Sequence, residues 1–528
     1  MPRKTNRFWL AALITAWSVD FLFFANSPGI SFLIWVVILL LAGLWLARSE
    51  GVHPAPMTWV MMGLLILTAA IPFVRVEPFT VVISILLSIS GLVLLAATYR
   101  NGNWLYFRTW DTVGGMLTVL LASATRPFGL FKSTPADAGD GQPAETGRKS
   151  FWKQAAPVLR GLLLALPVVG VLAVLLSAAD MVFADRLKDL FSFFNIEKLP
   201  EYIFRMIFIL VLTFLFAGVY LHALLPTREA ARPEPDQPVV KPFLGWIESV
   251  IVLGAVVLLF AFFVGVQFWY LFGGEANITA AGYTYSEYAR RGFSELVAVA
   301  VLSLLLTLTL GSIARREGKW QGTISTVLTA ALLALVLVIL GSALQRLLLY
   351  EQAYGFTRLR TYTLIFIPWL GLLLLAAIGL EITKRGGRFG LALLIAAVGF
   401  GLAVGAWNVD GFIARQNIER GIRGEEFDRA YLGELSTDAV PAMLKYYQQP
   451  ELDDPIRTSL GAELSCHAAF LKEEGQLSWK SWTISRVVAE NQLSDEDFSA
   501  YPVDVSEGVY TVTIGSEQVP CIEYGGMD

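Results

Sequence analysis

Residues 388–420 read RFGLALLIAAVGFGLAVGAWNVDGFIARQNIER and contain the change that decides the fold. Residues 389–407 are almost wholly apolar, whereas charged residues recur from Asp410 onward. A helix needs about twenty apolar residues to cross roughly 30 Å of hydrocarbon, because unpaired backbone groups are costly there. The stretch therefore predicts a last membrane span that ends near Asn408 and a water-soluble domain after it.

The chain before this stretch is equally apolar. Hydrophobic residues make up 55% of the 528 residues and charged residues 16%, a balance that excludes an ordinary soluble protein. Eleven stretches are long and apolar enough to span a membrane, namely residues 8–25, 29–47, 57–74, 79–99, 156–178, 203–225, 246–271, 293–313, 323–345, 362–382 and 388–407. We expect an all-α polytopic transmembrane helix bundle of about eleven spans, followed by a small extracytoplasmic C-terminal α+β domain.

Residues 110–131 decide the predicted orientation, because polar residues interrupt this further apolar stretch. If they lie along the inner surface, the segments on the side of the N-terminus hold 20 Lys and Arg and the opposite loops hold 9, as expected of cytoplasmic loops. We therefore predict a cytoplasmic N-terminus and an extracytoplasmic C-terminal domain, in a bacterial cytoplasmic membrane. The predicted units are a four-span segment (1–109), an interfacial helix with a polar linker (110–155), a seven-span core (156–410) and a soluble domain (411–528).

The soluble domain is acidic and holds both cysteines of the chain. Residues 411–528 contain 21 acidic and 9 basic residues, so the domain is a poor partner for nucleic acid. Cys466 and Cys521 both fall in this segment, which the topology assigns to an oxidising compartment. We therefore predict a disulfide between them, although two separate buried thiols remain an alternative.

Short amphipathic helices and one hairpin are expected in this domain. The helices are predicted at residues 425–435, 438–448, 455–474 and 479–491, with Asp438 and Asp454 as N-caps. Alternating Val and Thr residues after Gly508 predict a hairpin that turns at Gly515-Ser516. The domain is large enough for a modest core of its own.

Five strings in this sequence resemble a family of bacterial polytopic membrane proteins known as domain of unknown function 4173. They are LLSAADMVFAD (175–185), YSEYARRGFSEL (285–296), AYGFTRLRTYTL (353–364), NVDGFIARQNIER (408–420) and STDAVPAML (436–444). The resemblance covers roughly residues 160–445 and implies an integral membrane protein with no assigned activity.

The same strings place polar residues at the predicted outer ends of spans. The candidate ligand-binding residues are Asp180, Tyr288, Arg290, Arg291, Arg358, Arg360, Asp410 and Arg415. In one interpretation, the four paired arginines clamp an anionic lipid or solute, since guanidinium groups bind anions bidentately. In the other they form an ion-pair belt, in which Glu287 pairs with Arg290 or Arg291 and Asp410 with Arg358 or Arg360. Both interpretations remain open at this point.

No sequence motif indicates a reaction, a cofactor or a metal site. Phosphate-binding, zinc-protease and hydrolase motifs are missing, and the three histidines lie far apart in the predicted topology. We expect a non-catalytic envelope protein that binds, senses or scaffolds, with the lipid bilayer and an envelope protein as partners. One alternative is a transporter or lipid-handling protein for an anionic ligand. A second is a membrane-embedded transferase with Asp20 and Asp180 as acid and base.

Overall fold

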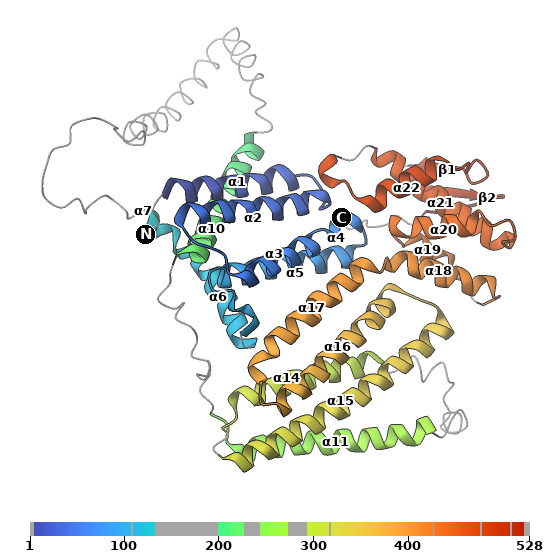
Figure 1. Ribbon diagram of the computed structural model, residues 1–528. Helices are drawn as coiled ribbons and strands as arrows, with labels where there is room; N and C mark the ends of the chain where they lie inside the picture. Colours follow the sequence, from blue (N-terminus) through green and yellow to red (C-terminus); the bar gives the residue numbers. More distant parts are fainter. Residues whose placement is uncertain are drawn as a thin grey trace, which may run out of the picture.

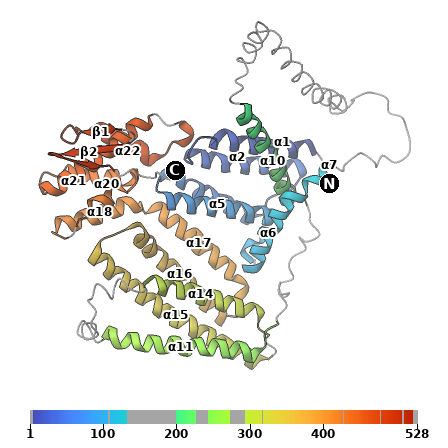
Figure 2. The ribbon, with the colours of Figure 1, turned by 180° about the vertical axis from the view of Figure 1, so that it is seen from behind.

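The structure of the protein, a computed structural model, is mostly helical (Figure 1). It describes residues 5–106, 109–131, 199–225, 243–272, 293–315, 318–425, 427–475, 478–506 and 509–521. Two groups of long helices lie side by side, and a compact C-terminal domain lies against one end of them (Figures 1 and 2). The predicted helical bundle followed by a small α+β domain is confirmed.

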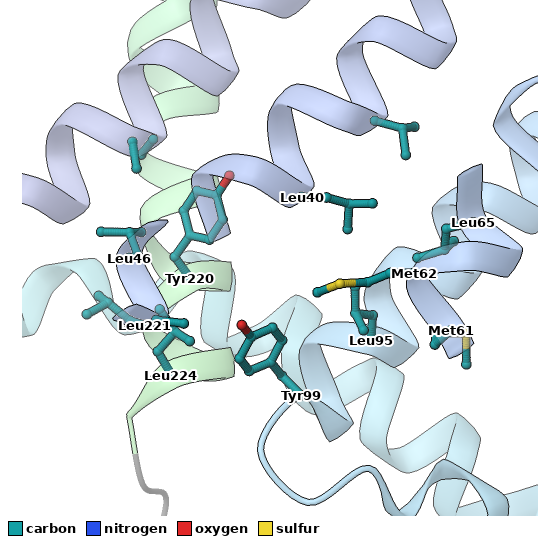
Figure 3. Close-up of a cluster of buried hydrophobic side chains, with 14 of the residues drawn as sticks. Leu40, Leu46, Met61, Met62, Leu65, Leu95, Tyr99, Tyr220, Leu221 and Leu224 are labelled. Atoms are coloured by element: carbon teal, nitrogen blue, oxygen red, sulfur yellow. The ribbon is translucent and has the colours of Figure 1, made fainter. Parts of the chain in front are cut away.

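The first group of helices packs around an apolar core (Figure 3). It consists of α1 (Thr5–Phe23), α2 (Ile30–Glu50), α3 (Pro56–Ala69), α4 (Ile71–Val74), α5 (Pro78–Thr98) and α10 (Leu199–Leu224). Leu40, Met62 and Leu95 are buried in this core. Tyr220 of α10 reaches among them, and its hydroxyl oxygen lies 2.8 Å from that of Thr15 on α1. Close packing and this hydrogen bond hold α10 against helices from the start of the chain, because membrane helices associate through such contacts.

The second group follows in the sequence and has a separate core. It consists of α11 (Trp246–Phe272), α14 (Phe293–Ile313), α15 (Lys319–Tyr354), α16 (Arg358–Ile382) and α17 (Phe389–Ala406), with the turn η4 (Gly386–Arg388) before α17. Helix α17 lies between the two groups and packs against both α16 and α5. A Cβ atom at Gly405 would lie 2.8 Å from Cγ1 of Ile71, and one at Gly401 would collide with Leu87. These glycines allow the close approach of α17 to the first group.

A further helix, α6 (Thr109–Thr125), and the short α7 (Pro127–Phe131) follow the turn η1 (Asn103–Tyr106). Figure 1 shows α6 running steeply across the direction of α3 and α5. Its C-terminal end meets α10 near the end of that helix, where Nη1 of Arg126 donates to the carbonyl of Leu221 over 3.3 Å. A Cβ atom at Gly218 would collide with the backbone of Ser123, so α6 and α10 are in close contact there.

In its described residues, the C-terminal domain has five α-helices, two single turns and a three-stranded sheet. Its elements are α18 (Val409–Ile422), α19 (Arg429–Gly433), η5 (Thr437–Ala439), α20 (Val440–Tyr447), α21 (Asp454–Glu474), η6 (Trp479–Ser481), α22 (Ile484–Ser494), β1 (Val503–Ser506), β2 (Val509–Ile514) and β3 (Glu517–Pro520). The strands are antiparallel in the order β1-β2-β3, with Val512 opposite Val503 and Ile514 opposite Glu517. The predicted hairpin turn at Gly515-Ser516 is confirmed, whereas β1 was not expected.

The predicted disulfide between Cys466 and Cys521 is confirmed. It joins α21 to the residue that follows β3, and Ala462 and Val512 are buried beside it. The prediction that Asp438 and Asp454 cap helices is wrong. Asp454 is the first residue of α21, after N-cap Asp453, and the Asp438 carboxylate instead accepts hydrogen bonds from another part of the chain.

Each long helix has a tail-proximal end, next to the C-terminal domain, and a tail-distal end. Three contacts with η6 and the following Trp482 identify tail-proximal ends in the first group. The rings of Phe21 and Trp479 are 6.3 Å apart, those of Phe73 and Trp482 are 5.4 Å apart, and the N–H of Ile30 donates to the carbonyl of Trp482 over 3.0 Å. The C-terminal domain therefore rests directly on the connections between α1 and α2 and between α4 and α5.

Ten helices in the described part of the chain are long and apolar enough to cross a membrane. Residues 112–130 are one of them, although we expected this stretch to lie along the inner surface. Helix α1 is not one of them, because Arg7 and Asp20 lower its mean hydropathy. Helix α15 is longer than the predicted span at 323–345, and the predicted span at 156–178 lies outside the described residues. The architecture is that of a multi-pass membrane protein.

Candidate functional site

Arg358 and Asp410 form the centre of the junction between the bundle and the C-terminal domain. Nε of Arg358 donates to Oδ1 of Asp410 over 2.9 Å, and Nη2 donates to Oδ2 over 2.8 Å. The Asp410 side chain is 0% exposed, and its Oδ2 also accepts from the N–H of Ser436 over 2.7 Å. A buried carboxylate needs such partners, because an unpaired buried charge is strongly destabilising. This is one of the pairings that the ion-pair interpretation predicted.

Helix ends place both side chains of this pair. Asp410 lies in the first turn of α18, after the N-cap Asn408, where the helix dipole favours a carboxylate. Arg358 is the first residue of α16, and its N–H donates to the hydroxyl of Tyr431 over 2.6 Å. Nη2 of Arg358 also donates to the carbonyl of Glu434 over 2.7 Å. Arg358 therefore connects α16 to both α18 and the segment around α19.

A second carboxylate connects the loop between α4 and α5 to the C-terminal domain. Oδ2 of Asp438 accepts from the N–H of Val76 over 3.0 Å and from that of Glu77 over 3.1 Å. Nη1 of Arg75 lies 3.6 Å from Oδ1 of the same carboxylate. Burial raises the pKa of Asp438 above its usual value, against the lowering effects of hydrogen bonds from Ser485 and Val76 and of the Arg75 charge.

Together, Arg75, Glu77, Arg358, Asp410 and Asp438 form one group, which we call the junction cluster. Glu77 connects the Arg358–Asp410 pair to Asp438, because its Oε1 lies 4.0 Å from Nε of Arg358 and its N–H donates to Asp438. The same side chain caps the N-terminus of α5. Nε of Arg75 donates to the carbonyl of Gly405 over 3.0 Å, at the end of α17. The junction cluster thus ties the tail-proximal ends of α5, α16 and α17 to the C-terminal domain.

A second seam joins α18 to the connection between α15 and α16. The side-chain amide of Asn417 accepts from the N–H of Phe356 over 2.8 Å and donates to its carbonyl over 2.9 Å. Nη2 of Arg420 donates over 3.2 Å to the carbonyl of Ala353, one of the last carbonyls of α15, which lack partners within the helix. Gly355 has φ +77°, and a Cβ atom there would lie 2.9 Å from Oδ1 of Asn417, so glycine is required.

Two of the predicted rim arginines lie near this seam but outside the ionic contacts of the junction cluster, as far as the described residues show. Nη1 of Arg360 donates to the carbonyl of Gly355 over 2.7 Å, and its guanidinium carbon lies 3.9 Å from the ring centroid of Tyr350. Arg415 is exposed, with its guanidinium carbon 5.7 Å from the ring centroid of Phe412. The structure therefore brings Arg358 and Asp410 together and leaves Arg360 and Arg415 apart from them.

Asp180, Tyr288, Arg290 and Arg291 lie outside the described residues, and their place at the rim stays a prediction. The same holds for the suggested pairs of Glu287 with Arg290 or Arg291.

Asp20, the candidate acid or base of the transferase alternative, is described and lies elsewhere. Arg205 of α10 donates to it from Nε over 3.1 Å and from Nη2 over 2.6 Å. The guanidinium carbon of Arg205 also lies 4.2 Å from the ring centroid of Phe24. This pair therefore joins α1 to α10 near the tail-proximal end of α1.

Sequence reasoning missed Arg75, Glu77 and the role of Asp438. The sequence Arg75-Val76-Glu77-Pro78 does predict one role of Glu77. An acidic residue directly before a proline at the start of a span is suited to cap that helix. Nothing local indicates that the loop meets Asp438, since the two segments are 361 residues apart.

The chemistry of the junction cluster is that of a structural connection. Its two guanidinium groups and three carboxylates face one another, backbone groups or serine hydroxyls, and the Asp410 and Asp438 side chains are 0% and 1% exposed. Among the described residues, no group of three or more His, Cys, Asp or Glu side chains is arranged to hold a metal ion. The geometry favours the ion-pair interpretation for Arg358, while binding of an anion by the wider rim stays a prediction.

Comparison with known proteins gives a family and no activity. No curated protein and no solved structure matches the chain. The family number 4173, suggested by the five strings, is not confirmed. The chain instead matches the family described as "Domain of unknown function (DUF4153)" over residues 62–446, a region that includes every member of the junction cluster. The protein therefore belongs to the family of unknown function DUF4153.

Proposed function

We propose that this protein is a non-catalytic protein of the bacterial cytoplasmic membrane that holds an acidic binding or scaffold domain rigidly at the outer surface. In this proposal the N-terminus is cytoplasmic, residues 1–109 and 156–410 form the membrane bundle, and residues 411–528 form the extracytoplasmic domain. The ligand of that domain is another component of the envelope.

The junction cluster is the observation that carries this proposal. A domain that only needed an anchor would follow its last span through a free linker, whereas here Asn408 leads directly from α17 into α18. Buried ion pairs are then formed with two other connections of the bundle, through Arg75 and Arg358. A buried pair favours one arrangement over others, because each alternative leaves a charge unpaired. The domain is therefore held in one orientation relative to the membrane.

The distribution of positive charge supports the proposed sidedness. Exposed basic residues gather at tail-distal ends, where Arg100 follows α5, Lys319 begins α15, and Lys384, Arg385 and Arg388 connect α16 to α17. Short cytoplasmic loops accumulate Lys and Arg. The tail-distal face is thus the cytoplasmic face in this proposal, and the C-terminal domain lies outside.

Helix α6 fits this arrangement as a helix along the cytoplasmic surface. The contacts of its two ends support this, because Thr112 lines a cavity with Gly390, near the tail-distal start of α17, while Arg126 bonds to Leu221, near the tail-distal end of α10. A spanning helix would have one end on each side. Helix α1 is the first span in this proposal, since Leu10, Leu13 and other large apolar side chains on one of its faces are exposed as lipid-facing residues would be.

Site-specific photo-cross-linking in cells tests the proposed function. A photoreactive residue is placed at the exposed tail positions Glu451 or Ser499, and at the exposed tail-distal position Lys384 as the matched control. We expect an adduct of defined size from the tail positions alone, which is lost in the Arg358→Gln variant at equal protein level. Adducts that are absent from the tail positions, or that survive loss of the junction, contradict a rigid binding platform.

Sidedness is tested separately with single cysteines at the same positions. A membrane-impermeant maleimide should label Glu451→Cys but not Lys384→Cys in intact cells, and it should label both after permeabilisation. The native cysteines do not interfere, because they are joined in a disulfide. Labelling of Lys384→Cys alone would reverse the proposed orientation.

A further inference from the structure

A cavity of about 310 Å³ lies between α3, the second half of α5, the start of α6 and the tail-distal half of α17. Its floor consists of buried apolar residues that include Met61, Leu65 and Leu94. Trp104 of η1 lines it as well, with its indole N–H satisfied by the carbonyl of Met57 over 3.1 Å. Thr68, Ser90 and Thr112 are the other lining residues with polar side chains, so most of the lining is apolar and the cavity suits an apolar occupant.

The cavity opens sideways between the helices. Its lining includes Ser90 on α5, Val113 on α6 and Leu393 on α17, and these three side chains are exposed at the surface that a membrane would cover. An apolar cavity of about 150 Å³ in a soluble protein takes up benzene, so a cavity twice that size accommodates a longer apolar group. In a bilayer the adjacent apolar groups are lipid acyl chains.

A cluster of positive charges lies next to the same cavity. Lys384, Arg385 and Arg388 are exposed in the connection between α16 and α17, and none of them forms an ion pair with a described residue. The turn η4, which ends at Arg388, packs against η1, which contains the cavity residue Trp104. Gly390, two residues after Arg388, lines the cavity itself.

We infer that this cavity and the neighbouring basic turn form a binding site for one anionic phospholipid of the tail-distal leaflet. An acyl chain enters the cavity past Ser90 and Leu393, and the phosphate group lies against Arg385 and Arg388. Basic pockets between membrane helices bind anionic headgroups in this way, and the separation of apolar and cationic surfaces matches the two ends of a lipid. The inference depends on neither the junction cluster nor the proposed role of the C-terminal domain.

Native mass spectrometry of the full chain with chain-matched phosphatidylglycerol and phosphatidylcholine tests this site. The Ala397→Phe variant fills the cavity, and Ile395→Phe, on the exposed side of the same helix, is its matched control. The variant R385Q/R388Q removes the headgroup contacts, and R315Q/K319Q removes the same charge elsewhere at the tail-distal end.

We expect the wild-type chain to bind one phosphatidylglycerol in preference to phosphatidylcholine. Each Arg near an anionic headgroup strengthens lipid binding about fivefold. Loss of both arginines in R385Q/R388Q should therefore weaken phosphatidylglycerol binding by about thirtyfold. Ala397→Phe should abolish binding of this lipid, and both controls should retain it. Equal binding of phosphatidylglycerol and phosphatidylcholine by the wild type would contradict the proposed site. Retention of phosphatidylglycerol in Ala397→Phe, or a loss in R315Q/K319Q equal to that in R385Q/R388Q, overturns it as well.

Discussion

Replacing Arg358 by Gln is the most informative perturbation of the junction. The substitution removes two hydrogen bonds, of 2.9 and 2.8 Å, from the buried Asp410 carboxylate and leaves it the N–H of Ser436. Removal of one partner from a buried ion pair costs about 3–5 kcal/mol, because the remaining charge stays desolvated. Arg358→Lys keeps the charge but not the two-point geometry, so its cost should be smaller, about 1–3 kcal/mol.

Pulse proteolysis in urea, with the protein in lipid nanodiscs, measures this effect as the free energy of unfolding of the C-terminal domain. The matched control is Arg423→Gln, because the side chains of the Arg423–Glu425 pair are 57% and 36% exposed. Loss of such a surface pair should cost about 0–1 kcal/mol. The double variant R358M/D410L should recover part of the loss, since it removes the stranded Asp410 carboxylate, while the Glu77 carboxylate keeps the N–H groups of Phe79 and Thr80. An Arg358→Gln variant no less stable than Arg423→Gln would refute the reasoning.

Three further predictions concern the C-terminal domain and its contact with the bundle. Burial lowers the pKa of His467 from 6.5 to about 4, so the folded domain keeps this imidazole neutral while the unfolded chain takes up a proton. His467 should therefore lower the free energy of unfolding by about 3 kcal/mol as the pH falls from 6.5 to 4. A His467→Gln variant whose urea midpoints show the same pH dependence as the wild type would contradict this. Cys466→Ser should cost about 4 kcal/mol, because the disulfide closes a separation of 55 residues in the unfolded chain, and reduction of the wild type must lower its midpoint equally. Gly29→Ala should loosen the contact of η6 with α2 and cost about 1–3 kcal/mol in the same assay, since its Cβ would lie 2.7 Å from the carbonyl oxygen of Trp482. Gly63→Ala is the control, because a Cβ atom there meets nothing within 4 Å and should not lower the free energy of unfolding. Equal destabilisation by Gly29→Ala and Gly63→Ala would contradict a specific role for the contact between Gly29 and Trp482.

The long helices could be predicted from the sequence because each must satisfy its own backbone in an apolar environment. Their ends were less predictable. Helix α15 continues to Tyr354, past the predicted limit of 345, and Arg420 of α18 satisfies three of its final carbonyls, those of Glu351, Gln352 and Ala353. Strand β1 reads VDVS, an alternation of only four residues that is too short to predict a strand by itself, and it forms by pairing with β2.

The Arg358–Asp410 pair of the junction cluster could be predicted from the sequence, whereas the contacts of Arg75, Glu77 and Asp438 could not. Arg358 and Asp410 both stand at the outer end of a predicted span, where a costly charge needs a partner, so their pairing was one of two expected arrangements. Arg75 and Glu77 belong to a short loop whose partner lies far away in the sequence, and Asp438 has the local appearance of a helix cap. Its carboxylate instead bonds to Val76 and Glu77, which only the folded chain brings near.

The distance between the bundle and the C-terminal domain in a bilayer tests the central claim most directly. Spin labels at Ser27→Cys and Ser499→Cys, both exposed in the structure, report this distance by double electron–electron resonance in nanodiscs. The junction cluster predicts a single narrow distribution that broadens in the Arg358→Gln variant. A broad distribution in the wild type, unchanged by that substitution, would show a tethered domain and contradict the rigid platform.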